Sequence, residues 1–145
     1  MRLNQQTDLA FRVLIHAALC PERKITIDEV AKAFQVSRNH LMKVVHQLAR
    51  LGFLETTRGA GGGMTLAHPA QAINLADVAK GVEPDFGLVE CFRPDNQCVI
   101  TPACSLAGIL DQARQAFIDV LAAYKLADLV EGSQARDLKL LLKLG

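Results

Sequence analysis

Apolar residues recur at helical spacing in several parts of the 145-residue chain, and polar capping residues mark where these segments begin. A first helix is predicted over about residues 4–19, and it ends before Pro21. Thr26 and Glu29 have the form of a capping box, in which each side chain accepts a hydrogen bond from a free backbone N–H at the start of a helix. This pair predicts a second, short helix over residues 26–34.

A tight turn at Gln35 and Val36 separates this helix from a third, for which Ser37 is a suitable N-cap and Gly52 a stop. A short helix, a turn and a longer helix form the helix-turn-helix arrangement, whose later helix enters the major groove of DNA. We therefore expect the exposed face of the third helix to contact DNA. That face carries the polar residues Arg38, Asn39, His40, Lys43, His46, Gln47 and Arg50.

The position of each polar residue along this helix predicts whether it contacts bases or phosphates. Arg38 and Asn39 lie in the first turn, where a recognition helix meets the base edges, so they are the candidates for base contacts. Lys43 and Arg50 are candidates for phosphate contacts. His40 and His46 are equally well explained as ordinary solvated side chains.

Two short extended runs follow, at residues 53–58 and 64–66, on either side of a glycine-rich tip. This pattern predicts a β-hairpin, the wing of a winged helix. Arg58, Gly61 and Gly62 are candidate DNA contacts on the wing, and Arg58 is placed to reach a minor groove or a phosphate. A nucleotide phosphate loop is disfavoured, because no Lys-Ser/Thr pair follows Gly63.

The second half of the chain predicts a short helix over residues 74–83, an irregular stretch to Thr101, and a long helix that begins at Thr101-Pro102. The long helix is predicted to pair with a partner helix, with packing inside its own monomer as the alternative. Residues 126–144 are expected to form a frayed or weakly ordered tail. The predicted pairing seam consists of Leu106, Leu110, Ala113, Phe117, Val120 and Tyr124.

These elements predict a mainly α fold: a winged helix-turn-helix with a small β-hairpin wing, plus a long dimerisation helix. We divide the chain into a DNA-binding domain (1–83), a loop that carries cysteines (84–103), a dimerisation helix (104–130) and a C-terminal tail (131–145). Residues 1–65 carry nine Lys/Arg against five Asp/Glu, whereas residues 66–145 carry seven against ten. The basic half is the candidate for contact with a polyanion.

No apolar run is long enough to cross a membrane, so a cytoplasmic protein is expected. A lipoprotein signal ending at Cys20 is disfavoured, because Asp8 and Arg12 bracket the region and Leu19 stands where a cleavage site prefers a small residue. In the reducing cytosol, clustered cysteines favour a metal or redox site over a disulfide framework.

Three cysteines, Cys91, Cys98 and Cys104, are spaced C-x6-C-x5-C. Zinc sites usually show paired cysteines two to four residues apart and four N/S ligands, and neither is visible here. Thiolates on a turn-rich loop can instead hold a multi-iron cluster from several sides, which favours iron–sulfur over zinc, inert thiols or a disulfide. Cys104 is expected near the third position of the long helix, where free N–H groups stabilise a metal-bound thiolate.

Three thiolates leave one iron of a cubane cluster without a cysteine ligand. An iron held there by oxygen or by an exchangeable ligand is the weak point of a cluster, since a soft diatomic molecule displaces a hard carboxylate more readily than a thiolate. Such a site suits a sensor. The candidates for the fourth ligand are Cys20, which is more simply a buried small residue, an oxygen of Asp8, Glu90 or Asp95, a histidine, or a small molecule.

The helix-turn-helix, the R-G-x-x-G-G wing and the cysteine loop before T-P-A-C-x-L together resemble the NsrR family of nitric-oxide-sensing repressors, which is related to the iron–sulfur regulator IscR. Residues 36–41 and 124–130 resemble that branch specifically. The IscR branch has a histidine ligand soon after its last cysteine, and no histidine follows Cys104 here.

The resemblance implies a non-enzymatic homodimer with one [4Fe-4S] cluster per subunit, or a [2Fe-2S] cluster. The ligands it implies are Cys91, Cys98, Cys104 and Asp8, the last contributed by the partner subunit. It also implies repression at a near-palindromic double-stranded DNA operator, relieved by nitric oxide. The alternatives are a regulator of iron supply or cluster assembly, a thiol or cluster redox protein, and an interaction module with structural zinc.

Overall fold

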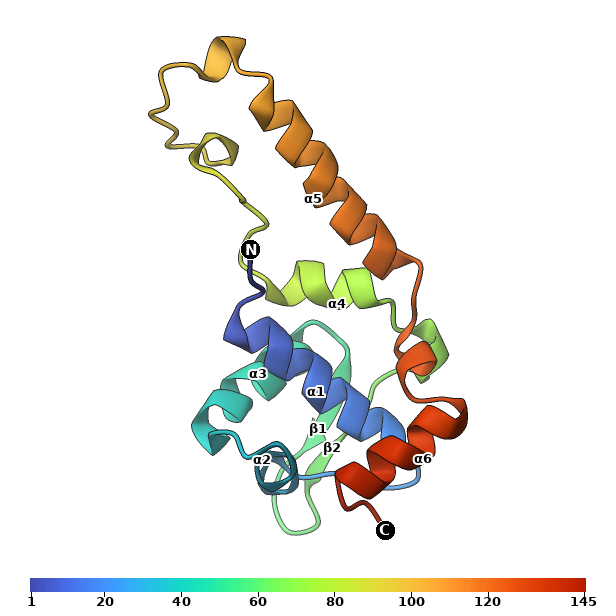
Figure 1. The fold of residues 1–145 in the computed structure, drawn as a ribbon. Helices are drawn as coiled ribbons and strands as arrows, with labels where there is room; N and C mark the ends of the chain where they lie inside the picture. The colour runs from blue at the N-terminus through green and yellow to red at the C-terminus, as the bar shows by residue number, and fades with distance from the viewer.

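The computed structural model describes all 145 residues and is mainly helical, with one small antiparallel sheet (Figure 1). None of its helices combines the length and apolar character needed to cross a bilayer. The elements follow in the order α1 (Gln5–Leu19), α2 (Ile27–Phe34), α3 (Arg38–Arg50), β1 (Leu54–Thr57), β2 (Gly63–Leu66), η1 (Ala70–Ala72), α4 (Leu75–Val82), η2 (Glu90–Phe92), η3 (Thr101–Ala103), α5 (Leu106–Ala122), η4 (Leu126–Leu129) and α6 (Gly132–Leu141), where η denotes a short 3₁₀ helix.

The core lies where α1 packs against α3 and α4. The apolar stripe of α1 includes Leu9, Val13 and Leu14, all essentially inaccessible to solvent, and α3 turns Leu41 and Leu48 toward the same interior. Because the apolar residues recur every three or four positions, each helix buries one face and leaves the other in solvent. The core therefore positions the polar face of α3 outward.

The predicted helix-turn-helix is confirmed. The capping box at the start of α2 is present in full, with the Glu29 backbone N–H donating to the Thr26 hydroxyl at 3.1 Å. α2 ends at Gln35, whose left-handed φ of 53° makes the tight turn, and the Val36 N–H donates back to the Ala31 carbonyl. α3 begins just after Ser37, although the Ser37 hydroxyl makes no capping hydrogen bond.

The predicted wing is also confirmed as a hairpin in which Leu54 pairs with Leu66 and Thr57 with Gly63. The tip needs glycine at Gly62, since a Cβ there would lie 2.4 Å from the Thr57 carbonyl oxygen. The hairpin is anchored to the body by a bridge between Met64 and Ile25, which lies two residues before α2. The wing is thus fixed beside the helix-turn-helix.

α5 extends away from the body, and the irregular segment between α4 and α5 returns to its far end (Figure 1). The prediction that this helix starts at Thr101-Pro102 was wrong. Those residues form a separate 3₁₀ turn, closed by the Cys104 N–H to the Thr101 carbonyl, and the extended ψ of 117° at Cys104 interrupts the helix. Cys104 therefore precedes α5 instead of lying in its first turn.

The expectation of a weakly ordered tail was also wrong, because η4 and α6 continue the chain after α5. Leu126 is fully buried in the core, and its N–H donates to the Ile73 carbonyl at 2.8 Å. Ala127 is buried beside it. Burial of these two side chains against α1 and η1 holds the segment that leads to α6.

Candidate nucleic-acid interface and cysteine loop

The outward face of α3 carries five exposed polar residues that were predicted from the sequence, Asn39, His40, Lys43, His46 and Arg50. The opposite face of the helix is packed into the core, so these side chains cannot turn inward. α3 contains no acidic residue. The structure therefore presents a helix with a polar, basic and solvent-exposed surface, of the kind that reads a DNA groove.

Two other residues predicted on this face have partners within the chain. The Arg38 Nε donates to the Asp28 carboxylate at 2.6 Å, although its side chain remains more than half exposed. Gln47 is only half exposed, and its amide lies 3.4 Å from the Gly81 carbonyl. Gln47 therefore lies at the border of the exposed face, beside Gly81 of α4, and its contact with DNA stays a prediction.

A groove separates α3 from the wing. It is lined by Met42 and His46 from α3 and by Arg58 and Gly59 from the hairpin. Arg58 is exposed at the end of β1, and Gly61 is exposed at the tip. The half-buried Gly62 directs its N–H to the Gly59 carbonyl, so its part is to shape the tip. Polar residues of the helix and of the wing therefore lie on the two sides of this groove.

The cysteine loop, residues 83–105, leaves the end of α4 and reaches the distal end of α5 (Figure 1). Cys91 lies in η2, Cys98 in the irregular stretch between η2 and η3, and Cys104 directly after η3. All three thiols are free; Cys98 is exposed, while Cys91 and Cys104 are half-buried. The predicted thiols are therefore unpaired and lie on one segment outside the core.

Hydrogen bonds within the loop set its shape. The Asn96 amide donates to the Thr101 hydroxyl at 2.9 Å, and the Asn96 side-chain oxygen accepts from the Cys98 N–H at 2.9 Å. The Glu90 carboxylate accepts a hydrogen bond from the Gln97 N–H at 2.9 Å. One oxygen of this candidate ligand is therefore already bonded to the backbone of the loop. These hydrogen bonds join residues of the loop to one another.

The donor set of the loop suits a polynuclear group better than a single ion. No three side chains of the loop bring their ligand atoms within 4.8 Å of one another, as ligands of one tetrahedral ion must. A cluster of several metal atoms takes each thiolate at a different metal and so tolerates wider spacing. Three free thiols on an exposed loop fit such a cluster.

The root of the loop is tied to the start of α1. Glu83, the first residue of the loop, accepts hydrogen bonds from the Thr7 hydroxyl at 2.5 Å and from the Asn4 N–H at 3.2 Å. Asn4 is also the N-cap of α1, and Thr7 is fully buried. Sequence analysis missed this link, because it joins residues 76 and 79 positions apart.

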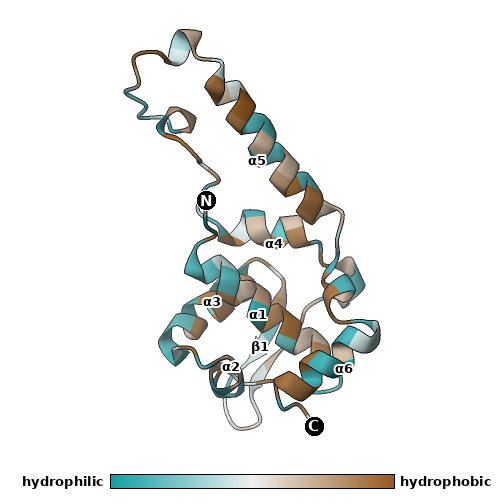
Figure 2. Cartoon of the chain, viewed as in Figure 1, coloured by the Kyte–Doolittle hydropathy of each residue, from teal (hydrophilic) through white to brown (hydrophobic).

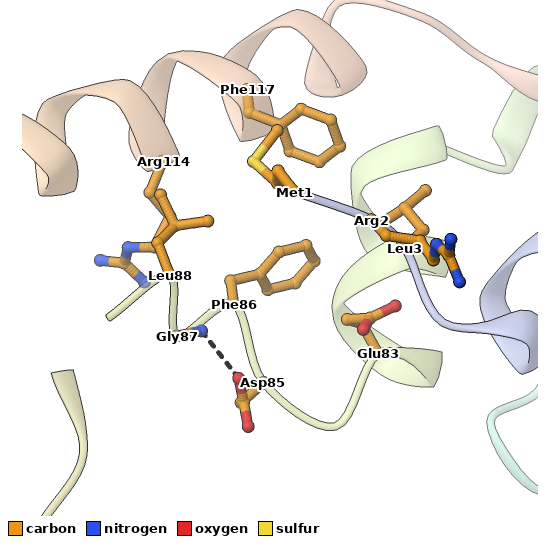
Figure 3. Close-up of a pocket in the computed structure, with 10 residues that line it drawn as sticks. All are labelled: Met1, Arg2, Leu3, Glu83, Asp85, Phe86, Gly87, Leu88, Arg114 and Phe117. Carbon is orange, nitrogen blue, oxygen red and sulfur yellow. Dashed lines mark hydrogen bonds between the residues drawn. The ribbon is translucent and has the colours of Figure 1, made fainter. Parts of the chain in front are cut away.

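Figure 3 shows how the loop root meets α5 and the N-terminus. Phe86 and Phe117 face each other with ring centroids 6.2 Å apart, and Met1 lies beside them. The Asp85 carboxylate accepts from the Gly87 N–H at 2.8 Å and closes the turn below Phe86. The root of the loop therefore contacts both the start of α1, through Glu83, and α5, through Phe86.

Asp8 and Cys20, two candidates for the fourth ligand, lie at opposite ends of α1. The Asp8 carboxylate is more than half exposed and pairs with Arg12 at 2.9 Å. Cys20 is buried, as expected, and about 18 Å farther along the helix by its rise per residue. Cys20 therefore does not join the loop thiols of its own chain, whereas Asp8 is accessible to another molecule.

α5 leaves an apolar face uncovered, but not the whole predicted seam. Phe117 and Leu110 are half-buried on the side of the cysteine loop, and Ile118 is buried on the side of α4. Apolar residues recur along the helix (Figure 2). The exposed stripe runs through Leu106, Ile109, Ala113, Ala116 and Val120, at spacings of 3, 4, 3 and 4, with the predicted Tyr124 also exposed beyond its end.

Comparison with known proteins agrees with this geometry. Residues 3–132 match the family described as "Rrf2: Iron-dependent Transcriptional regulator". The chain belongs to the Rrf2 family. It is 42% identical to the HTH-type transcriptional regulator NsrR of Bacillus subtilis, over 99% of both chains, and 44% identical to that of Geobacillus kaustophilus, over 90% of both. Like other Rrf2 proteins it is a DNA-binding transcriptional regulator and not an enzyme.

Solved structures share the fold of this Rrf2 protein. CymR, the global cysteine regulator of B. subtilis, superposes with a TM-score of 0.70 at 22% identity, covering 89% of this chain and 95% of CymR. IscR of T. potens gives a TM-score of 0.70 at 18% identity, covering 89% of this chain and 85% of IscR. The extended α5 and the adjacent winged helix therefore belong to a fold shared by Rrf2 regulators.

Proposed function

We propose that this Rrf2 protein is a homodimeric repressor whose DNA binding depends on an iron–sulfur cluster and is relieved by nitric oxide. The observation that carries the proposal is the presence of three free thiols on one exposed loop whose root is hydrogen-bonded to the first helix of the DNA-binding unit. Relatives that share 40–44% of the sequence are named NsrR.

Cys91, Cys98 and Cys104 would hold a [4Fe-4S] cluster, with Asp8 of the partner subunit as the fourth ligand. A [2Fe-2S] cluster is the alternative within the same proposal. When bound, the cluster supplies iron that reacts with nitric oxide, most readily where a carboxylate replaces a thiolate. Asp8 suits this role because its carboxylate is exposed and its one partner in the chain, Arg12, is itself a surface side chain.

The exposed stripe on α5 supports a dimer. Apolar side chains at alternating spacings of three and four are the pattern of a helix that packs along a second helix. Ile109 and Val120 are each about 60% exposed, which leaves a large apolar area in water unless a partner covers it. A two-fold pair of chains would offer two α3 helices to half-sites about 34 Å apart.

The link between loop and DNA runs through residues of this chain. Glu83 ends α4 and holds the start of α1 through Thr7 and Asn4, and α1 packs along α3. A shift of the loop root would therefore reorient α1 and with it the recognition helix. A 100-fold change in operator affinity requires a coupling free energy of about 2.7 kcal/mol, which a few hydrogen bonds and a ligand bond can supply.

The test uses full-length protein purified without oxygen and an operator selected from random duplex DNA. We expect coloured protein with iron and sulfide, tight operator binding at one stated salt concentration, and loss of both colour and binding as nitric oxide is added. Cys98→Ser is expected to lose the cluster, whereas Cys20→Ser, at the buried cysteine outside the loop, is expected to keep it.

Asp8→Ala separates cluster binding from signalling. We expect this variant to retain the cluster but to lose most of the nitric-oxide-dependent release of DNA. Unchanged release in Asp8→Ala would remove Asp8 from the mechanism. Iron-free wild-type protein that binds the operator with full affinity would overturn the proposed dependence on a cluster. Release on iron chelation with no release by nitric oxide would identify an iron-supply regulator.

A further inference from the structure

A second set of potential metal ligands lies far from the cysteine loop, where α1 meets α2. His16 and Cys20 are four residues apart, so they occupy the same face at the end of α1, and Glu29 reaches them from the first turn of α2. One ligand atom of each lies within 4.8 Å of the other two. Both His16 and Cys20 are buried, and Glu29 is largely so.

A positive group already occupies this position. The Arg23 guanidinium places one nitrogen 2.5 Å from Glu29 Oε1 and 3.6 Å from the Cys20 sulfur. The hydrogen bond from Arg23 lowers the pKa of Glu29 to about 2, so this side chain is a carboxylate at neutral pH. The Arg23 side chain is itself nearly half exposed and can swing into solvent. A basic side chain thus sits where a cation would bind.

The three donors are oriented toward this position. His16 Nε2 lies 3.2 Å from Glu29 Oε1, while its Nδ1 is buried without any hydrogen-bond partner. The imidazole packs edge-on against Phe34, with centroids 6.1 Å apart, which fixes the plane of the ring. Glu29 Oε2 accepts hydrogen bonds from the Thr26 N–H at 3.4 Å and from Arg23 Nη1 at 3.0 Å. Once Arg23 leaves, Oε1 can bind an ion while Oε2 still caps α2.

We propose that His16 Nε2, Cys20 Sγ and Glu29 Oε1 form a site for a divalent transition ion of the Zn²⁺ type, closed in the metal-free protein by Arg23. One imidazole, one thiolate and one carboxylate make a ligand set that Zn²⁺ accepts, with a fourth position left for water. The site does not depend on the iron–sulfur proposal, because it shares no residue with the loop.

Charge balances when the ion enters. The metal-free site holds the Glu29 carboxylate, the Arg23 cation and a neutral Cys20 thiol, whose pKa is raised by burial. On binding, Arg23 moves to solvent and Cys20 releases one proton to water. Two negative ligands then neutralise the divalent ion. The ion would bridge the end of α1 to the start of α2, and so couple metal supply to the rigidity of the helix-turn-helix.

The test uses full-length protein in which Cys91, Cys98 and Cys104 are replaced by serine, so that Cys20 is the remaining thiol. The probes are Co²⁺, whose bond to a thiolate produces a charge-transfer absorption, and Zn²⁺ in competition with a chelating dye. We expect one ion per chain, the thiolate absorption, and release of about one proton per ion at neutral pH.

Variants at the site separate a designed ligand set from chance binding. Cys20→Ser is expected to abolish the absorption and weaken Zn²⁺ binding at least 100-fold. Arg23→Gln keeps all three ligands and removes the competing cation, so it is expected to tighten binding about tenfold. Arg136→Gln, at an exposed arginine of α6 with no part in the DNA surface or the site, is the matched control and should leave Zn²⁺ affinity unchanged. Circular dichroism checks that each variant is folded.

Two results would overturn the site. The first is an absence of thiolate–cobalt absorption in the folded triple-serine protein. The second is binding that is equal in Cys20→Ser and its parent, which would place the ion elsewhere. Should Cys20→Ser fail to fold, Arg23→Gln decides alone: unchanged affinity would show that the guanidinium does not compete for the position and would reject the proposal.

Discussion

The hydrogen bond between Thr7 and Glu83 provides a quantitative test of how the cysteine loop is joined to the DNA-binding unit. Thr7→Val keeps the shape of the side chain but removes the hydroxyl that donates to the Glu83 carboxylate at 2.5 Å. Thr7 is fully buried, so water cannot replace the lost donor easily. After the change, Glu83 retains the Asn4 N–H, at 3.2 Å.

A hydrogen bond to a charged group contributes about 1.5–3 kcal/mol to the free energy of unfolding. We expect Thr7→Val to lose this amount, because the carboxylate keeps a weaker partner and the rest of the core is unchanged. The urea midpoint of the cluster-free protein should fall without a change in the slope of the transition. Thr7→Ser retains the hydroxyl and is the control, with a loss limited to one methyl group.

The same variant tests the route of signalling. If the loop root acts on α1 through Glu83, the ratio of operator affinities before and after nitric oxide should shrink in Thr7→Val and stay near wild type in Thr7→Ser. A Thr7→Val protein within about 0.5 kcal/mol of wild type would show that the bond is energetically neutral. Full nitric-oxide response in a destabilised Thr7→Val would place the coupling elsewhere.

Three further predictions concern other parts of the molecule. The Glu29 carboxylate is only 27% exposed and has its pKa lowered from 4.5 to about 2, so it should stabilise the fold by about 3 kcal/mol above pH 4.5. The difference in unfolding free energy between wild type and Glu29→Gln should therefore shrink as the pH falls from 4.5 toward 2; a pH-independent difference would contradict this. Lys43→Ala should reduce the slope of log affinity against log salt by about 1, and an unchanged slope would show that Lys43 meets no phosphate. Ile109→Asp should convert the dimer to monomer in sedimentation experiments, whereas Asp111→Asn, at an exposed polar residue of the same helix, should not.

Local patterns in the sequence predicted the DNA-binding half well. The capping box of Thr26 and Glu29, the turn at Gln35 and the hairpin around Gly62 each depend on residues within a few positions of one another. The helical spacing of apolar residues also predicted correctly that Cys20 is buried. The three loop thiols were visible from their spacing alone.

Predictions failed where distant contacts outweighed a local signal. The predicted cap at Thr101 is absent: Thr101 and Pro102 are the first residues of a 3₁₀ turn, and α5 begins only at Leu106. The segment after α5 is ordered because Leu126 is buried in the core and its N–H donates to the Ile73 carbonyl. The seam on α5 shifted because Phe86 of the loop root covers Phe117. None of these contacts has a signature in the adjacent sequence.

The projecting α5 acts mechanically as a lever. Its 17 residues span about 25 Å along the axis, and its base packs on α4. A tilt of roughly 5° at that base would displace the distal end by about 2 Å, several times the tolerance of a metal–ligand bond. In the proposed dimer, a small repacking around Ile118 would therefore move the loop thiols of one protomer out of reach of Asp8 on the other.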